Sequence, residues 1–123
     1  MIRLSLSIAV AALLLAAPAG AMGHPKLIGV VGKNDAFTIS LKTGSGKLVQ
    51  STKIKAGLYT FVIHDDSTLH NFELDGPRGF AHKFTDVSST GTKTTTLRLK
   101  AGKYKYYCVA HESQMFHFFT VKK

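Results

Sequence analysis

The residues best suited to chemistry lie close together near the end of this 123-residue chain. Cys108 is the only cysteine, and His111 and Met115 follow it within one short segment. A predicted strand ends at the thiol, a tight loop carries the imidazole, and the next strand begins after the thioether. His70 precedes another predicted strand, and neighbouring strands of a sheet can bring such distant residues together. The sequence therefore predicts one metal site made by His70, Cys108, His111 and Met115.

The residue types of this site favour copper. Two imidazoles, one thiolate and a weak thioether are the ligand set of blue copper sites. Thiolate and thioether favour Cu(I), and imidazole accommodates both oxidation states, so we expect one copper ion that alternates between Cu(II) and Cu(I). Zinc sites more often use several cysteines or paired histidines. Nucleophilic catalysis by Cys108 would need an orienting acid and an oxyanion-binding loop, which the sequence does not offer, so we do not expect an enzyme.

The elements that must position these residues are predicted to be strands. From Pro25 onward, short β-rich runs alternate with Gly, Asn, Asp and Ser, and no segment has convincing helical periodicity. This pattern predicts an all-β fold, a Greek-key β-sandwich of about eight strands. We expect an irregular loop, with room for a short helical turn, over residues 79–91. The expected strands are 27–31, 36–41, 48–54, 58–64, 71–74, 92–99, 103–108 and 116–121.

Two segments of the chain echo one another. Ile54-Lys-Ala-Gly-Leu-Tyr59 and Leu99-Lys-Ala-Gly-Lys-Tyr104 each place an aliphatic residue before a Gly turn and a strand that begins near Tyr. Two copies are too few for a solenoid repeat. We interpret them as two related corners of the predicted sandwich.

Several motifs together resemble the cupredoxins, small blue copper proteins of the plastocyanin, pseudoazurin and amicyanin kind. The resemblance covers most of the chain after residue 21. It rests on Gly57-Leu-Tyr-Thr-Phe-Val-Ile63, on Leu69-His-Asn-Phe72, on the run from Leu99 to His111, and on Met115 followed by Phe119-Thr-Val121.

The resemblance implies a role for each residue of the site. His70, Cys108 and His111 correspond to the equatorial copper ligands, and Met115 corresponds to the long axial ligand. Asn71 corresponds to the residue that holds the ligand loops together and donates a backbone hydrogen bond to the thiolate sulfur. The resemblance further implies a tyrosine corner over Leu99–Tyr104 and electron transfer through the edge of His111, within an apolar patch.

The chain departs from the family pattern in two places. Three residues separate His111 from Met115, where relatives commonly have two or four, so the reach of Met115 depends on this loop. His117 stands where relatives usually have Gly, and strand alternation gives it the parity of Met115 and Phe119. His117 could therefore point toward the copper end, perturb the axial side or compete for the metal.

Residues 1–21 have the pattern of a secretory signal peptide. A basic start at Arg3 precedes an apolar run, and small residues surround Ala21. We expect cleavage between Ala21 and Met22, which leaves a cupredoxin-like copper-binding domain over 22–123 in the periplasm or another exported location. An uncleaved membrane anchor is the alternative. Cleavage would also expose Met22-Gly23-His24, a segment that could bind a second Cu(II) ion.

The chain is strongly basic, with 16 Lys and Arg against 7 Asp and Glu and a formal net charge of +9. For an exported protein this charge favours an acidic protein partner over nucleic acid. We therefore predict a monomeric one-electron carrier that docks a redox protein with an acidic face and is not stably inserted in a membrane after cleavage. A copper delivery or storage protein is the alternative with the same ligands, and a metal-free sandwich used for adhesion or assembly is a third.

Overall fold

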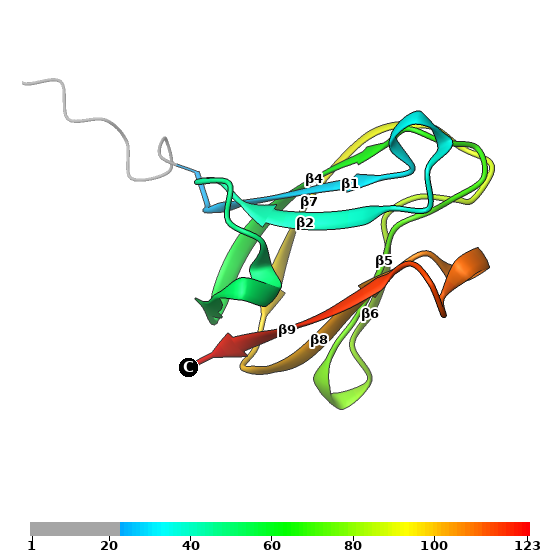
Figure 1. Cartoon of the computed structure of the whole chain (residues 1–123). Helices are drawn as coiled ribbons and strands as arrows, with labels where there is room; N and C mark the ends of the chain where they lie inside the picture. Colours follow the sequence, from blue (N-terminus) through cyan, green and yellow to red (C-terminus); the bar gives the residue numbers. More distant parts are fainter. Residues whose placement is uncertain (1–22) are drawn as a thin grey trace, which may run out of the picture.

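The computed structural model describes residues 23–123, and the predicted signal peptide and its cleavage site lie outside this range. Two sheets face one another, with the order β2-β1-β4-β7 in one and β3-β9-β8-β5-β6 in the other (Figure 1). The strands are β1 (Lys26–Val31), β2 (Ile39–Thr43), β3 (Lys53–Lys55), β4 (Gly57–Asp65), β5 (Glu73–Asp75), β6 (Ala81–Lys83), β7 (Gly91–Leu99), β8 (Gly102–Tyr107) and β9 (Phe116–Lys122). The predicted all-β sandwich is confirmed.

Short 3₁₀ turns occupy four of the connections described: η1 (Lys33–Asp35), η2 (Val49–Ser51), η3 (Pro77–Gly79) and η4 (Val109–His111). Both sheets are mixed, because β1 pairs in parallel with β4 and β3 pairs in parallel with β9, while the other pairs are antiparallel. Within residues 23–123, none of the helical turns has the length and apolar character needed to cross a membrane.

Alternation along the strands places one face of each sheet in the core. In β4, Tyr59, Phe61 and Ile63 are buried, and the residues between them are only half-buried. In β7, the even-numbered residues from Thr92 to Arg98 are exposed and Leu99 is buried, as the sequence pattern predicts. Apolar side chains from both sheets therefore meet between them and form the core.

The strand boundaries differ from the sequence prediction in three places. β6 lies inside the segment predicted as an irregular loop, because Ala81–Lys83 pairs with β5. The strand predicted over 48–54 is divided into the turn η2, where Val49 is buried, and the short β3. The strand predicted over 36–41 begins only at Ile39, because Phe37 leaves the sheet to contact the histidines described below.

The two echoing segments form equivalent corners, as predicted. The Tyr59 hydroxyl donates to the Lys55 carbonyl, and the Tyr104 hydroxyl donates to the Lys100 carbonyl at 2.8 Å, so each Tyr bonds the residue four positions before it. The glycines of the two copies, Gly57 and Gly102, have φ angles of +150° and +149°, which other residues rarely adopt. The similarity of the two sequences therefore reflects a backbone conformation that the two corners share.

Candidate metal centre

The strand pairing explains why two distant segments meet. β5 and β8 are antiparallel neighbours, and Glu73 at the start of β5 lies opposite Tyr107 at the end of β8. The chain just before β5 and the chain just after β8 therefore reach the same end of the sandwich. His70 comes from the first segment, and Cys108 and His111 come from the second.

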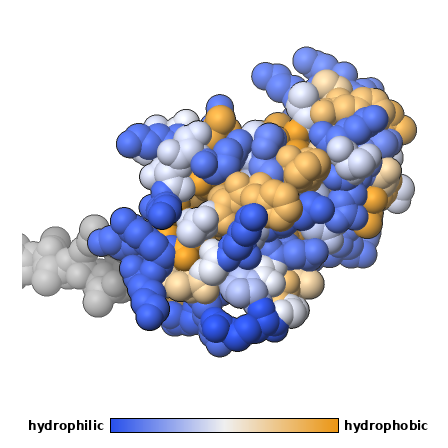
Figure 2. Space-filling view, turned by 60° about the horizontal axis from the view of Figure 1, so that its bottom comes forward, coloured by the Kyte–Doolittle hydropathy of each residue, from blue (hydrophilic) through white to orange (hydrophobic). Residues whose placement is uncertain are grey.

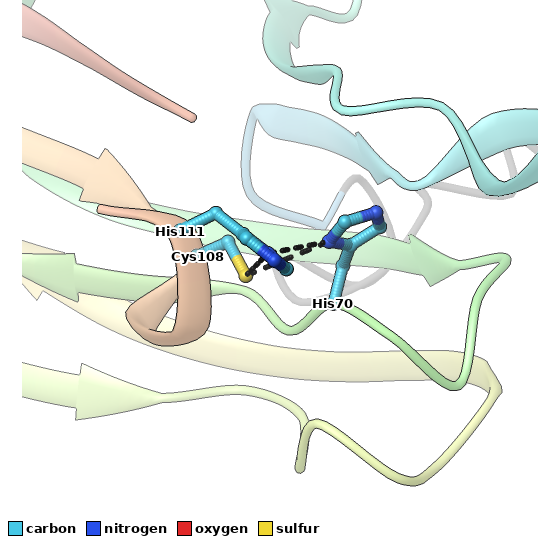
Figure 3. A group of neighbouring side chains, drawn as sticks. All are labelled: His70, Cys108 and His111. Atoms are coloured by element: carbon cyan, nitrogen blue, oxygen red, sulfur yellow. Dashed lines mark hydrogen bonds between the residues drawn. The ribbon is translucent and has the colours of Figure 1, made fainter. Parts of the chain in front are cut away.

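These three side chains converge on one point (Figure 3). The Nδ1 atoms of His70 and His111 are 3.1 Å apart, and Cys108 Sγ lies 3.9 Å from Nδ1 of His70 and 3.8 Å from Nδ1 of His111. His70 and Cys108 are fully buried, whereas His111 is half-buried. The structure thus brings together three of the four predicted ligands, with one ring at the protein surface.

The spacing of the three donor atoms fits a single metal ion. A circle through atoms separated by 3.1, 3.8 and 3.9 Å has a radius of about 2.1 Å. Metal–nitrogen and metal–sulfur bonds in comparable protein sites measure about 2.0–2.3 Å. One ion near the centre of the triangle would therefore reach both nitrogens and the sulfur. A soft sulfur with two borderline nitrogens is the donor set that suits copper.

Asn71 joins the two ligand segments. Its backbone N–H donates to Cys108 Sγ at 3.4 Å, and its side-chain Oδ1 accepts from the backbone N–H of Val109 at 2.8 Å. Its Nδ2 donates to the Thr85 carbonyl at 3.2 Å and to Glu73 Oε2 at 2.9 Å. The contacts expected of Asn71 from the cupredoxin resemblance are thus present in the structure.

The segment before His70 is held by its own side chains. The Ser67 N–H donates to Asp65 Oδ1 at 3.2 Å, and the Leu69 N–H donates to Ser67 Oγ at 3.1 Å. Such side-chain acceptors replace backbone partners in tight turns. Asp65 and Ser67 are both buried, so these turns are part of the support of His70.

Backbone hydrogen bonds close the loop between Cys108 and Met115. The Cys108 N–H donates to the Met115 carbonyl at 3.0 Å, and the Met115 N–H donates to the His111 carbonyl at 2.8 Å. The Met115 side chain is buried, with 1% exposed. The three-residue spacing therefore forms a closed loop with Met115 in the core, and the axial ligand role of Met115 stays a prediction.

His117 does not join the cluster. It is exposed, and its ring lies against Tyr106, its partner in the pairing of β8 with β9, with a centroid distance of 5.4 Å. The pairing places it on the same side of the sheet as Tyr106, yet Tyr106 is buried and His117 is exposed. The possibility that His117 competes for the metal is therefore not supported by its position.

Phe37 is a contact that the sequence did not reveal. Its ring packs edge-on against His70 and His111, at centroid distances of 4.9 and 4.5 Å, although about half of Phe37 remains exposed. Leu69 and Val109, next in sequence to ligand segments, are also about half exposed. We call Phe37, Leu69 and Val109 the apolar rim. A single Phe in a predicted strand gives no signal of such a role.

One buried carboxyl lies close to the cluster. Burial raises the pKa of Asp65, and this effect is opposed by hydrogen bonds from Thr85 and Ser67 and by the nearby His70 ring. The Thr85 hydroxyl also accepts from the Phe72 N–H at 2.9 Å. Asp65 and Thr85 were not predicted as site residues, although the Asp-Asp-Ser sequence before His70 is typical of a side-chain-capped turn.

Comparison with known proteins gives a match in structure only. No protein-family model matches the chain, and no curated protein sequence matches it significantly. A crystal structure of variant rusticyanin has a TM-score of 0.56 at 19% identity, with 79% of this chain and 76% of that chain covered. Rusticyanin from Thiobacillus ferrooxidans has a TM-score of 0.54 at 18% identity over the same shares of the two chains.

A third match, described as the copper protein rusticyanin, has a TM-score of 0.53 at 18% identity, again over 79% of this chain and 76% of that chain. At such identities the likeness establishes the fold, and the site must be judged from its own residues. The chain therefore has the cupredoxin fold, and its His70, Cys108 and His111 fit the donor set of a type 1 copper site.

Proposed function

We propose that this protein is an exported type 1 copper protein that carries one electron between redox partners and is not an enzyme. The observation that carries the proposal is the convergence of two imidazole nitrogens and the only thiol within 4 Å of one another, on a fold shared with rusticyanin. A bound copper ion would supply the Cu(II)/Cu(I) couple. His70, Cys108 and His111 would hold it, with Met115 as the axial ligand.

The support of the cluster favours electron transfer. Asn71 ties the His70 segment to the Cys108 loop, and the loop itself is closed between Cys108 and Met115 by backbone hydrogen bonds. Ligands held in this way move little when the charge of the ion changes. Since little rearrangement accompanies each electron, exchange should be rapid.

The surface around His111 suggests where electrons pass. His111 is the only ring of the described cluster that reaches the surface, and its ring contacts Phe37 of the exposed apolar rim. An apolar contact of this kind excludes water from the short path between two redox centres. Small interfaces of this type are weak and release quickly, as electron carriers require.

The partner is proposed to be an acidic redox protein that binds a monomer of this chain. The net charge of +9 would steer such a partner. Positive and apolar groups also gather on the outer face of the β8–β9 sheet, where Lys103 and Lys105 lie 4.5 and 5.8 Å from the Phe118 ring. Figure 2 brings this face forward and shows hydrophobic surface with hydrophilic side chains on both sides.

Copper titration tests the metal site. Metal-free wild-type protein should take up one Cu(II) ion and develop an intense visible band, because thiolate-to-copper charge transfer absorbs strongly. Cys108→Ala should abolish the band, whereas His117→Ala, which removes a histidine outside the cluster, should keep it. A wild-type protein that binds no copper, or a band that survives Cys108→Ala, would overturn the proposal.

Electron self-exchange separates a carrier from a delivery or storage protein. In mixtures of the Cu(I) and Cu(II) forms, a carrier should show NMR line broadening that reports rapid exchange. Slow self-exchange together with transfer of the copper ion itself to an acceptor would favour delivery or storage. The proposed export has its own test: the mature protein recovered outside the cytoplasm should begin at Met22.

A further inference from the structure

Two buried polar atoms beside the metal centre have no hydrogen-bond partner among residues 23–123. One is Nε2 of His70, the ring nitrogen on the side away from the cluster (Figure 3). The other is Oδ2 of Asp65. The two residues are 0% and 1% exposed. A buried polar group without a partner costs free energy, so both atoms call for an explanation.

The two atoms have complementary roles. Nδ1 of His70 faces Cys108 Sγ and Nδ1 of His111, so Nδ1 is the nitrogen placed to bind a metal. A neutral imidazole that binds through Nδ1 carries its proton on Nε2 and is a hydrogen-bond donor there. Oδ1 of Asp65 accepts from the Ser67 N–H, and the Thr85 hydroxyl also stabilises the charged carboxyl. Oδ2 still has the capacity to accept a further hydrogen bond. The two groups share one turn: the Ser67 N–H holds the Asp65 carboxyl, and Ser67 Cβ and His70 Cδ2 both border the same point beside Gly32.

The fold shields this pair from solvent through the end of β1. Gly32 follows β1 in a left-handed conformation, with φ of +70°, and a Cβ atom there would lie 2.5 Å from Ser67 Cβ and 3.0 Å from His70 Cδ2. Cδ2 is the ring atom bonded to Nε2. A backbone hydrogen bond also joins the two segments: the Asp66 N–H donates to the carbonyl of Val31, the last residue of β1, at 3.0 Å. Backbone thus packs directly over the segment that carries Asp65, Ser67 and His70.

We propose that Asp65 is a positioning residue for His70, and that its carboxylate accepts the proton on Nε2 through one bridging water. Metal-binding histidines commonly donate their second N–H to such an acceptor, which fixes the tautomer and the ring orientation and makes the ligand nitrogen more basic. The consequence for copper rests on the proposed function. The hydrogen bond itself does not, because in the metal-free chain His70 can keep its proton on Nε2 while its Nδ1 accepts from Nδ1 of His111.

NMR of the metal-free protein tests the hydrogen bond. In wild type, the His70 Nε2 proton should give a resolved resonance that exchanges slowly with water. Asp65→Leu removes the acceptor and should abolish the slow exchange. Asp65→Asn keeps an oxygen of the same shape and should retain it in part, which also covers the case in which the Leu variant does not fold. Asp66→Asn changes an exposed carboxylate one position away and should leave the signal as in wild type.

The copper-loaded protein gives a second readout. Asp65→Leu should weaken copper binding by about 10–100-fold, the usual effect of losing the partner of a metal-binding histidine. Asp65→Asn should raise the reduction potential, because a nearby negative charge stabilises Cu(II), and Asp66→Asn should raise it much less. An Nε2 proton that exchanges equally fast in wild type and in Asp65→Asn would overturn the inference, as would equal effects of the Asp65 and Asp66 variants. Failure of copper binding in wild type would instead remove the proposed function and leave the NMR result standing.

Discussion

Met115 is fixed in the core by a loop whose backbone bonds both Cys108 and His111. If its sulfur is the axial ligand, Met115→Leu should leave copper bound, because Leu fills a similar volume at a cost below about 1.5 kcal/mol. The hydrocarbon side chain also makes this side of the site less polar, which destabilises the more highly charged Cu(II), so the reduction potential should rise. Voltammetry of wild type and variant checks this. An unchanged potential would show that Met115 is a core residue and no ligand. Loss of all copper would show that Met115 is more than a weak axial ligand.

The side chain of Asn71 links the Cys108 segment and the chain before β7 to the segment that carries His70. Asn71→Ala removes the acceptor of the Val109 N–H and a donor to the Thr85 carbonyl. Each group left without a partner costs about 1–3 kcal/mol when water cannot replace it. Val109 is about half exposed, so water can replace the partner of its N–H. The loss should then come mainly from the Thr85 carbonyl, so the free energy of unfolding in urea should fall by about 1–3 kcal/mol, and copper should dissociate faster.

Glu73→Gln is the matched control for Asn71→Ala. It changes only the acceptor of one Asn71 hydrogen bond and leaves the bonds of Asn71 to Val109 and Thr85 in place. Its unfolding free energy should stay within about 0.5 kcal/mol of wild type. Similar losses in the two variants would show that Asn71 has no special role in joining the loops.

At the scale of elements, a side-chain hydrogen bond links the turn η2 to β8. The hydroxyl of Tyr106 on β8 donates to Gln50 Oε1 at 2.9 Å, and burial raises the pKa of Tyr106 from 10.0 to about 12. The folded state therefore holds this proton more tightly than the unfolded state. Stability from this group is fully present below pH 10 and is lost as the pH rises from 10 to about 12.

Tyr106→Phe tests this linkage. At pH 7 the variant should lose about 1 kcal/mol of unfolding free energy with the hydrogen bond to Gln50. Between pH 10 and about 12 its stability should fall less steeply than that of wild type, because one group with a raised pKa is gone. Urea unfolding at several pH values measures both effects. Parallel pH profiles for the two proteins would contradict the assignment to Tyr106.

The elements show why part of the structure could be predicted from sequence. The two corners were predictable because each repeats a local pattern whose Gly conformation and Tyr hydrogen bond depend on neighbouring residues alone. β6 was not, because a strand of three residues exists only through its pairing with β5. The same holds within the site: residue types and spacing indicated Cys108 and His111, whereas the contacts of Phe37 and Asp65 depend on tertiary packing.

At the scale of the whole molecule, the net charge of +9 should control how fast redox reagents reach the centre. Oxidation of the Cu(I) protein by an anion such as hexacyanoferrate(III) should slow as ionic strength rises from about 0.01 to 0.1 M, because the Debye length falls from about 30 to 10 Å.

A cationic cobalt complex of similar size is the matched control, and its reaction should become faster over the same range because screening weakens its repulsion. Stopped-flow absorbance of the copper band follows both reactions. If both slopes were reversed, with hexacyanoferrate(III) reacting faster and the cobalt complex more slowly as salt rises, the charge near the apolar rim would differ in sign from that of the whole chain. A partner with an acidic face would then no longer be the expected one. A slower reaction with the anion and a faster reaction with the cation would place the positive field at the end of the molecule where His111 reaches the surface, which is what docking of an acidic redox protein requires.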